Sequence, residues 1–313
     1  MSVFFSSLDI AVQAGVVIIL AGMGELLLER TGVMNLGIEG MISIGAVAAV
    51  LMATVSSEPV VCLLVAVGAG MAVGAVFALF AVVLRVNQVL AGLAIFLLCI
   101  GLTNELGADY SNVPVKATFD DLALPGLSSI PEIGPALFDQ PILVYVAYVV
   151  LPCVVWLVLF RSRHGLNVRA VGENPAAADA AGISVMRIRT AYCLVAGGLA
   201  AAAGAYLMLS LTPSFSLNPA GGRGWVALAA VIFAAWLPWR LVAAGLLFGG
   251  LTSLGLTAQA QGWNIPTVIF AVLPYVVTIA LMFLIALRLR LQRLELREVA
   301  PAALATPYYR EER

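Results

Sequence analysis

The sequence has 313 residues, of which 62% are hydrophobic and only 11% are charged, and its formal net charge at pH 7 is -1. Soluble domains carry about 25% charged residues, so this composition excludes a globular protein that exposes its whole surface to water. The chain is therefore predicted to be an integral membrane protein.

Apolar segments recur from one end of the chain to the other. A helix needs roughly 20 apolar residues to cross a hydrocarbon core about 30 Å thick. The sequence predicts an all-α integral membrane protein, a polytopic helical bundle of about 8–10 transmembrane helices. A single transmembrane domain is expected over 1–287, followed by a tail over 288–313. The segments that approach this length lie at about 8–28, 33–54, 60–84, 87–104, 141–160, 190–211, 224–238, 241–262 and 266–287.

Charged residues are distributed unevenly between these segments. The loop 161–189 and the tail are rich in arginine, whereas the loop 105–140 carries six carboxylates and Lys116 as its only base. Because cytoplasmic loops carry an excess of Lys and Arg, we expect the loop 161–189 and the C-terminus inside and the loop 105–140 outside. Alternating crossings then place the N-terminus outside and leave Arg223 as an external exception. An interrupted helix near 29–40 would instead move the N-terminus to the cytoplasm.

A first departure from a plain lipid-facing helix lies between the first two apolar segments. Ionisable groups inside a membrane are costly and usually face a cavity, a pathway or a partner. For Glu29 and Arg30 we favour a short turn at the membrane surface. Asn35 and Glu39 are candidates for the substrate pathway, because nearby glycines permit an unwound segment of the kind that builds transporter sites. The polar residues of this stretch are Glu25, Glu29, Arg30, Asn35 and Glu39, and the glycines are Gly32, Gly37 and Gly40.

A second departure lies inside the arginine-rich loop, where the stretch from Gly172 to Ile183 is predicted to form one short helix. Asn174 is a good N-cap and Pro175 suits the first helical position. The alanines that follow have the highest helix propensity, and Gly182 can supply a left-handed C-cap. A helix this small in apolar surface is expected at the cytoplasmic face, either as a docking element or as an ordinary capped turn.

The other polar and small residues of the spans have weaker signals. Asn87 and Gln88 are candidates for a polar pathway, and the alternative is packing against a neighbouring helix, as amides in membranes usually do. Trp225, Trp236, Trp239 and Trp263 are expected at the membrane interfaces. Close helix packing explains most of the glycines, including Gly68, Gly70, Gly74, Gly197, Gly198 and Gly204.

The sequence supports neither a metal site nor ATP hydrolysis in this chain. The four cysteines lie far apart in apolar segments and are predicted to be small buried hydrophobes, and His164, the only histidine, has no partner for a metal site. No phosphate-binding GxxxxGK[ST] motif occurs in the sequence. We therefore expect no cofactor and no ATPase activity in this chain, so ATP could drive transport only through another chain.

Two of these stretches resemble a known family. The stretch from Glu29 to Met41, ERTGVMNLGIEGM, resembles the N-terminal signature of permeases in bacterial ATP-binding cassette (ABC) importers for nucleosides, within a wider superfamily of simple-sugar and branched-chain amino acid permeases. The stretch from Gly165 to Ala178, GLNVRAVGENPAAA, resembles the family's cytoplasmic coupling segment, and Ala181, Gly182 and Ile183 continue the match.

The resemblance implies a permease in the bacterial inner membrane with its C-terminus in the cytoplasm. It implies a second permease subunit of a different sequence, two ATPase subunits and an external solute-binding protein or lipoprotein as partners, and no nucleic acid polymer. Asn35 and Glu39 would lie near the pathway, together with Asn87 and Gln88 from the polarity argument. The residues expected to meet the ATPase are Glu173, Asn174, Pro175, Ala181 and Gly182.

Several alternatives remain at this point. The same machine could import a simple sugar or a branched-chain amino acid, because nothing in the spans identifies a nucleobase. A proton-coupled secondary transporter could use Glu25, Glu29 and Glu39 as proton sites, although such carriers usually show paired repeats with carboxylates at the membrane midplane. A membrane enzyme would need a nucleophile–base pair or a metal cluster, and a channel would leave the coupling-like loop unexplained.

Overall fold

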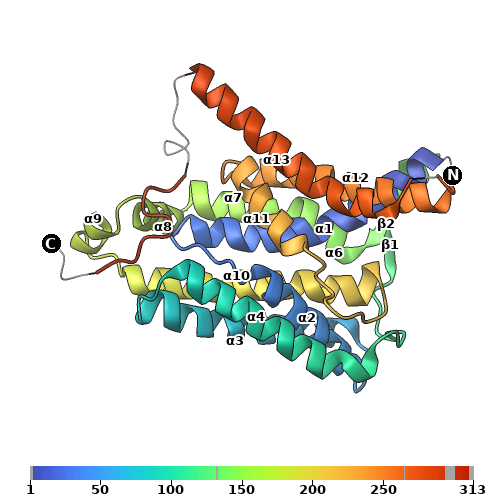
Figure 1. The fold of residues 1–313 in the computed structure, drawn as a ribbon, viewed down its shortest axis with the longest axis horizontal. Coiled ribbons are helices and arrows are strands. Elements are labelled where there is room, and N and C mark those ends of the chain that lie inside the picture. Colours follow the sequence, from blue (N-terminus) through green and yellow to red (C-terminus); the bar gives the residue numbers. More distant parts are fainter. Residues whose placement is uncertain (1–2, 132, 264, 293–299, 310–313) are drawn as a thin grey trace.

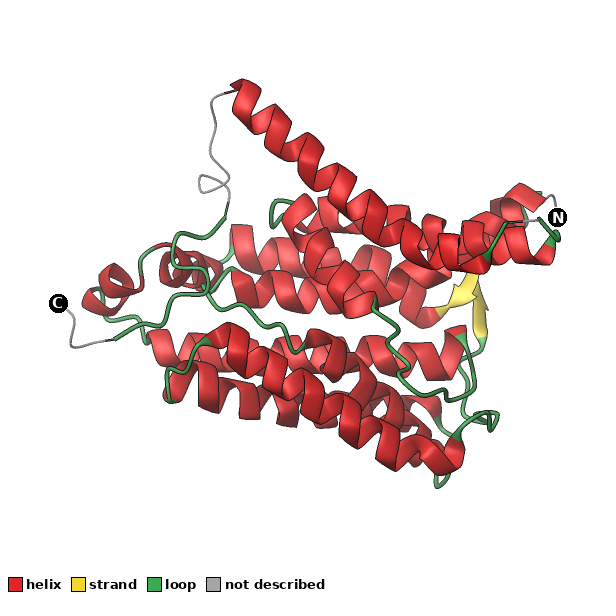
Figure 2. Cartoon of the chain, viewed as in Figure 1, coloured by secondary structure: helices red, strands yellow, loops and turns green. Residues whose placement is uncertain are grey.

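The computed structural model describes residues 3–131, 133–263, 265–292 and 300–309, and it shows a bundle of helices that run along one long axis (Figures 1 and 2). Within the described residues, six helical stretches are long and apolar enough to cross a bilayer. These are Val3–Glu29, Pro59–Val83, Gln88–Tyr110, Ile142–Arg161, Val185–Leu211 and Pro238–Ala260. The shorter apolar helices are Ile38–Ala53, Arg223–Phe233 and the stretch Val268–Leu284.

Ten helices make up these stretches of the described residues. They are α1 (Val3–Glu29), α2 (Ile38–Ala53), α3 (Pro59–Ala78), α4 (Gln88–Gly107), α6 (Ile142–Tyr145), α7 (Leu151–Trp156), α10 (Val185–Tyr206), α11 (Arg223–Phe233), α12 (Pro238–Ala260) and α13 (Thr267–Gln292). They match the nine predicted apolar segments in order, because α6 and α7 together belong to the single stretch Ile142–Arg161. Short π-helical turns extend α3, α7 and α10. Another, Val146–Val150, joins α6 to α7 just before Pro152, whose ring and missing N–H disturb the preceding turn.

The centre of the bundle is closely packed, and α10 lies against both α2 and α3. A Cβ atom on Gly70 would lie 2.2 Å from the carbonyl oxygen of Gly197, and one on Gly204 would lie 1.8 Å from that of Ile42. No side chain fits at such approaches, so these glycines allow the backbones to touch. The packing prediction is confirmed there, but it is wrong for Gly68, which has nothing within 4 Å of the same position.

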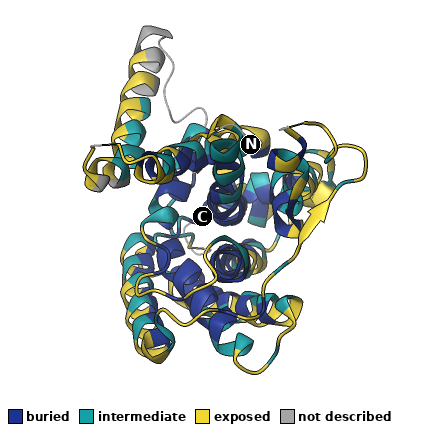
Figure 3. Cartoon of the chain, turned by 90° about the vertical axis from the view of Figure 1, so that its right-hand side faces the viewer, coloured by how far each residue is buried: buried dark blue, intermediate teal, exposed yellow. Residues whose placement is uncertain are grey.

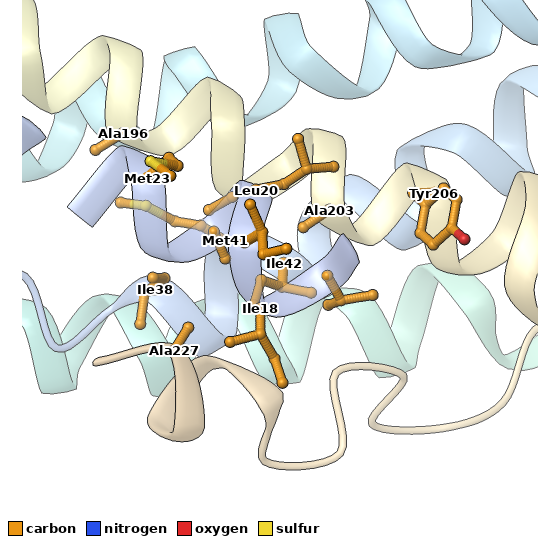
Figure 4. Close-up of a cluster of buried hydrophobic side chains, with 14 of the residues drawn as sticks. Ile18, Leu20, Met23, Ile38, Met41, Ile42, Ala196, Ala203, Tyr206 and Ala227 are labelled. Atoms are coloured by element: carbon orange, nitrogen blue, oxygen red, sulfur yellow. The ribbon is translucent and has the colours of Figure 1, made fainter. Parts of the chain in front are cut away.

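Figures 3 and 4 show how this core is built. The buried residues lie at the centre of the bundle and the exposed ones on its periphery (Figure 3). Ile18, Met23, Met41 and Ile42 from α1 and α2 meet small residues of α10 such as Ala203 (Figure 4). Large side chains on two helices thus fill the space that alanine and glycine leave on the third.

The two ends of the bundle are different. One end, called here the hairpin end, carries the start of α1, the strands β1 (Asp121–Ala123) and β2 (Asp139–Pro141) and the helix α5 (Ile133–Phe138) (Figure 1). The strands pair antiparallel, a small exception to the all-α prediction. The opposite end, called here the docking end, carries α8 (Arg163–Glu173), α9 (Pro175–Ala180) and the tail residues 300–309 (Figure 1).

The polar loops therefore separate as their charges predicted. The acidic loop 105–140 lies at the hairpin end and the arginine-rich loop 161–189 at the docking end. Gln140 Nε2 donates to Asp9 Oδ1 at 2.6 Å, so the first turns of α1 lie beside the acidic loop. This agrees with the alternation that puts the N-terminus on the side of that loop.

Candidate functional site

The second apolar segment is not a continuous helix. α1 ends at Glu29 and α2 begins only at Ile38, and residues 30–37 between them form turns and irregular backbone. At 1.5 Å per residue, the 16 residues of α2 span about 24 Å, less than a full hydrocarbon core. Thr31, Val33 and Asn35 are all buried in this irregular segment. The expected unwound segment is therefore present.

A second interrupted helix lies nearby. α11 has only 11 residues, about 16 Å of helix, and it follows the irregular segment 212–222. Its start lies against the middle of α4, where the rings of Trp225 and Phe96 are 5.4 Å apart. The predicted full crossing 224–238 is therefore wrong. Arg223 does not occupy a surface loop, because it begins this inner helix after Gly221 and Gly222, whose φ angles of 56° and 87° prevent the helix from starting earlier.

Glu39 joins the two interrupted helices. Its Oε1 accepts a hydrogen bond from Gly222 N and its Oε2 accepts one from Gly224 N, both at 2.6 Å. The first N–H groups of a helix have no partner within the helix and carry a partial positive charge, so a carboxylate suits this position. A Cβ on Gly224 would lie 2.6 Å from Glu39 Cα. We call the contact of Glu39 with Gly222 and Gly224 the junction.

Gln88 lies beside the irregular segment that contains Asn35. Asn35 N donates to Glu25 Oε1 at 2.8 Å, Gly37 N donates to Asn35 Oδ1 at 2.8 Å, and Met34 N donates to Gln88 Oε1 at 3.0 Å. These side chains replace the partners that the backbone N–H groups would have in a helix. Among the described residues, Glu25 Oε2 and Gln88 Nε2 are buried without a hydrogen-bond partner, so each retains capacity to bind a polar group.

Asn87 has different surroundings from its neighbour Gln88. It is exposed, and its Oδ1 accepts from Val89 N at 3.0 Å and from Leu90 N at 3.2 Å. This is an N-cap of α4. The structure thus brings Asn35 and Gln88 to the same irregular segment, places Glu39 in the first turn of α2, and leaves Asn87 exposed at the start of α4.

Glu29 and Arg30 are bound to a tight turn between α11 and α12. Trp236 Nε1 donates to Glu29 Oε2 at 2.5 Å, and Arg30 Nη2 donates to the Trp236 carbonyl oxygen at 3.0 Å. Glu29 and Trp236 are 1% and 3% exposed. The predicted turn after Glu29 is present, since Gly32 N donates to Glu29 O at 2.8 Å. The prediction of an interfacial Trp236 is wrong, because its ring is buried against Glu29 inside the protein.

A cavity of about 420 Å³ opens beside the start of α11. It lies between α1, α11, α12 and α13, and its wall combines aromatic rings with hydrogen-bonding groups. Arg223 Nη1 donates to Ala220 O at 3.2 Å, which holds the guanidinium group at the mouth of the inner helix. Sequence reasoning missed this cavity, because its residues come from four helices (α1, α11, α12 and α13) with no local motif. The polar and aromatic residues of its wall are Arg223, Thr252, Gln259, Phe248, Phe270 and Tyr275.

Acidic side chains gather at the hairpin end. Asp121 lies near Asp139, Asp9 and Asp120, and desolvation followed by these negative charges raises the pKa of the Asp121 carboxyl above its usual value. The surface here is therefore unfavourable for an anionic solute.

The predicted capped helix is present at the docking end as α9. Asn174 Oδ1 accepts from Ala177 N at 3.0 Å, Pro175 occupies the first turn, and Gly182 has a φ of 83°. Ile183 N closes the end of the helix on Ala178 O at 3.0 Å. The helix begins at Pro175, as the predicted N-cap at Asn174 requires, and Asn174 has an extended backbone, as residues before proline prefer.

The five predicted coupling residues lie on one accessible part of the protein. Four of them are exposed and Pro175 is half-buried. On the opposite side, Ala178 packs into a small apolar cluster with Val171 and Val185. The described residues contain no group of three or more side chains suited to a metal ion, and all four cysteines are free thiols, of which Cys153 alone is only half-buried.

Comparisons with known proteins agree with this arrangement. The family described as "Branched-chain amino acid transport system / permease component" matches residues 7–286. A putative glucose ABC transporter permease protein of Haloferax volcanii is 35% identical, over 97% of this chain and 97% of its own length. A guanosine ABC transporter permease protein of Bacillus subtilis is 31% identical, over 84% of this chain and 86% of its own length.

A nucleoside ABC transporter permease protein of Lactococcus lactis is 33% identical, over 85% of this chain and 88% of its own length. No solved structure matches the chain significantly. The chain therefore belongs to the branched-chain amino acid transport system permease family, as a multi-pass membrane subunit of an ABC transporter that transports rather than catalyses.

Proposed function

We propose that this chain is the permease of an ABC importer for nucleosides. The observation that carries the proposal is its similarity to permeases from two organisms whose names give guanosine and nucleosides as solutes, at 31% and 33% identity over more than four fifths of the chain. The segment from Asn35 to Gly40, NLGIEG, supports it, since it resembles the nucleoside branch of the family.

The chemistry of the cavity is compatible with such a solute. A nucleoside is neutral and has one flat apolar face and several hydroxyl groups, and small-molecule sites combine apolar walls with a few placed polar groups. Phe248, Phe270 and Tyr275 supply rings, while Thr252 and Gln259 supply hydrogen-bonding groups. The acidic hairpin end would disfavour phosphorylated relatives of the same solute.

The proposed mechanism is alternating access. Two ATPase subunits would bind at α9, through Glu173, Asn174, Pro175, Ala181 and Gly182, and a second permease of different sequence would complete the pathway. The docking end would then be cytoplasmic, in a bacterial inner membrane, and a solute-binding protein or lipoprotein would deliver the solute at the hairpin end. ATP can shift the permease between states only by binding the two states with different affinity.

The interrupted helices are the proposed moving part of the pathway. Asn35, Glu39 and Gln88 lie on or beside segments that lack continuous helix, and Asn87 lies at the edge of the same region. Broken helices at such sites expose backbone groups to a solute and rearrange more readily than a continuous helix.

Sugar import is the second candidate, and one observation favours it. The putative glucose permease of Haloferax volcanii matches 97% of this chain, more than either nucleoside relative does. A sugar would use the same polar groups in the cavity but would gain less from its aromatic rings.

The two candidates are separated by uptake and competition. Cells with the gene intact or deleted are given labelled guanosine, glucose or ribose, and guanosine uptake is also measured with excess unlabelled adenosine, glucose, ribose or leucine. We expect deletion to remove guanosine uptake and only the nucleoside to compete. If deletion spares guanosine and removes uptake of glucose or ribose, the nucleoside assignment is wrong and the sugar candidate stands.

A further inference from the structure

The C-terminal residues 300–309 form an ordered connection across the docking end, which we call the strap. Ala303 N donates to Gly172 O at 2.9 Å and Ala305 N donates to Gly32 O at 3.2 Å. The strap is thus bound by backbone hydrogen bonds both to α8, the helix before α9, and to the irregular segment 30–37. A free tail would make neither bond.

Arg189 of α10 binds both the strap and the irregular segment 30–37. Its Nε donates to Thr31 O at 3.1 Å and its Nη1 donates to Thr306 O at 3.2 Å, and its side chain is buried. Gly32 makes room for this contact, since a Cβ there would lie 2.9 Å from Arg189 Nη2 and 3.0 Å from Ala303 O. The irregular segment, the strap and α10 therefore meet at one point.

The far end of the strap reaches α9. Tyr308 Oη donates to Asp179 Oδ2 at 3.1 Å, and its ring packs on the apolar cluster of Val171, Ala178 and Val185. Tyr309 lies over the guanidinium group of Arg85, with 5.0 Å between Arg85 Cζ and the ring centre. The strap thus contacts the buried side of α9. It also reaches Glu173, whose Oε2 accepts from Ala302 N at 3.3 Å, whereas Asn174, Ala181 and Gly182 remain exposed.

We propose that the strap couples α9 to the pathway by transmitting movement of α9 to the irregular segment 30–37. This rests on the proposed docking of the ATPase at α9. The stretch from Ala305, which is bonded to Gly32, to Tyr308, which is bonded to Asp179, is only four residues long, so little slack lies between the two attachments. An ATPase that pulls α9 would then displace the start of the pathway through the strap, in addition to the direct approach of α8 to the same segment at Gly172 and Arg30.

The test uses the complete transporter, with both permeases, the ATPases and the solute-binding protein, reconstituted in proteoliposomes. Three quantities are measured for each variant: co-purification of the ATPases, stimulation of ATP hydrolysis by solute-loaded binding protein, and guanosine uptake per ATP hydrolysed. The test variants are Ala303→Leu, at a buried position, and Tyr308→Phe. Their matched controls are Ala302→Leu, at an exposed position, and Tyr309→Phe, which keeps the ring over Arg85.

We expect both test variants to retain the ATPases but to lose uptake per ATP by roughly two- to thirtyfold, the range seen for residues that couple distant sites. Both controls should behave as the wild type. Arg189→Lys, which retains one donor group, should recover part of the coupling that Arg189→Ala loses. Wild-type coupling in Ala303→Leu and Tyr308→Phe would overturn the proposal, and so would loss of the ATPases from both.

A further arm separates this proposal from the docking assignment on which it rests. Ala181→Trp, on the accessible side of α9, should release the ATPases. If it releases them while Tyr308→Phe retains them and uncouples transport, both assignments stand. If Ala181→Trp retains the ATPases and transports normally, the docking site is wrong, and the strap proposal falls with it.

Discussion

The junction and α9 are built in opposite ways, although both consist of short helices with defined ends. At α9 every cap comes from a residue within a few positions along the chain, such as Asn174 to Ala177 N and Ile183 N to Ala178 O. At the junction the cap of α11 is Glu39, from more than 180 residues away. Local caps define an exposed helix that can move as a unit, whereas a distant cap ties two helices together.

The comparison predicts that changes at the junction lower both stability and uptake, while changes on α9 lower uptake with only a small loss of stability. The largest effect is expected for Glu39→Ala, which leaves Gly222 N and Gly224 N without an acceptor. Hydrogen bonds to charged groups contribute about 1.5–3 kcal/mol each, so the loss should be about 4 kcal/mol of unfolding free energy. Thermal unfolding of the purified permease and guanosine uptake are the measurements.

Glu39→Gln should lose less unfolding free energy than Glu39→Ala, since the amide oxygen can still accept one of the two hydrogen bonds. The matched control is Glu58→Ala, which changes an exposed glutamate. Equal stability of Glu39→Ala and Glu58→Ala would show that the junction does not hold the two helices together.

The next largest loss of stability is expected for Gly224→Ala. The added Cβ would lie 2.6 Å from Glu39 Cα and 2.7 Å from Glu39 N, so α2 and α11 must separate, at a cost of about 1–3 kcal/mol for an overpacked core. Gly250→Ala, where nothing lies within 4 Å of the added atom, is the control and should be neutral or slightly stabilising. A similar unfolding temperature for the two variants would contradict the close approach of the helices.

A somewhat smaller effect is expected for Trp236→Phe, which removes the donor to Glu29 and keeps an aromatic ring. A buried carboxylate that loses its partner costs about 2 kcal/mol. Trp239→Phe is the control, because Trp239 is 47% exposed. The free energy of unfolding in denaturant should fall for Trp236→Phe alone, and an equal fall in both would mean that the bond to Glu29 contributes little.

The smallest effect on stability is expected on α9. Replacing Pro175 and Gly182 together by bulky or charged residues should abolish uptake, yet it should cost only about 1–2 kcal/mol, mainly from the left-handed backbone at Gly182. Membrane insertion should stay intact, as measured by the amount of folded protein in membranes. Normal uptake by a stably expressed double variant would remove the docking assignment.

The same contrast explains what the sequence could predict. Hydropathy placed the apolar helices, and the cap residues of α9 identified that helix because their partners are sequence neighbours. The glycines near Glu39 indicated an unwound segment. Nothing near Glu39, however, indicates Gly222, and nothing near Glu29 indicates Trp236, since these contacts depend on packing of the whole bundle.

Two errors have a common physical cause. Arg223 was assigned to an external loop and Trp236 to a membrane interface because hydropathy treats 224–238 as one crossing. The pair of glycines before Arg223 and the left-handed turn at Ala235 and Trp236 shorten the helix from both ends. The polar groups of Arg223 and Trp236 then find partners inside the protein, which a linear hydropathy pattern cannot show.

The most direct test of the central claim, transport driven by ATP on separate subunits, is guanosine uptake with the two energy sources separated. Cells or vesicles that carry the complete transporter are either depleted of ATP or treated with a protonophore at constant ATP. We predict that uptake stops without ATP and survives the protonophore. Uptake that follows the proton gradient at constant ATP would contradict the account and would point to Glu25, Glu29 and Glu39 as proton sites.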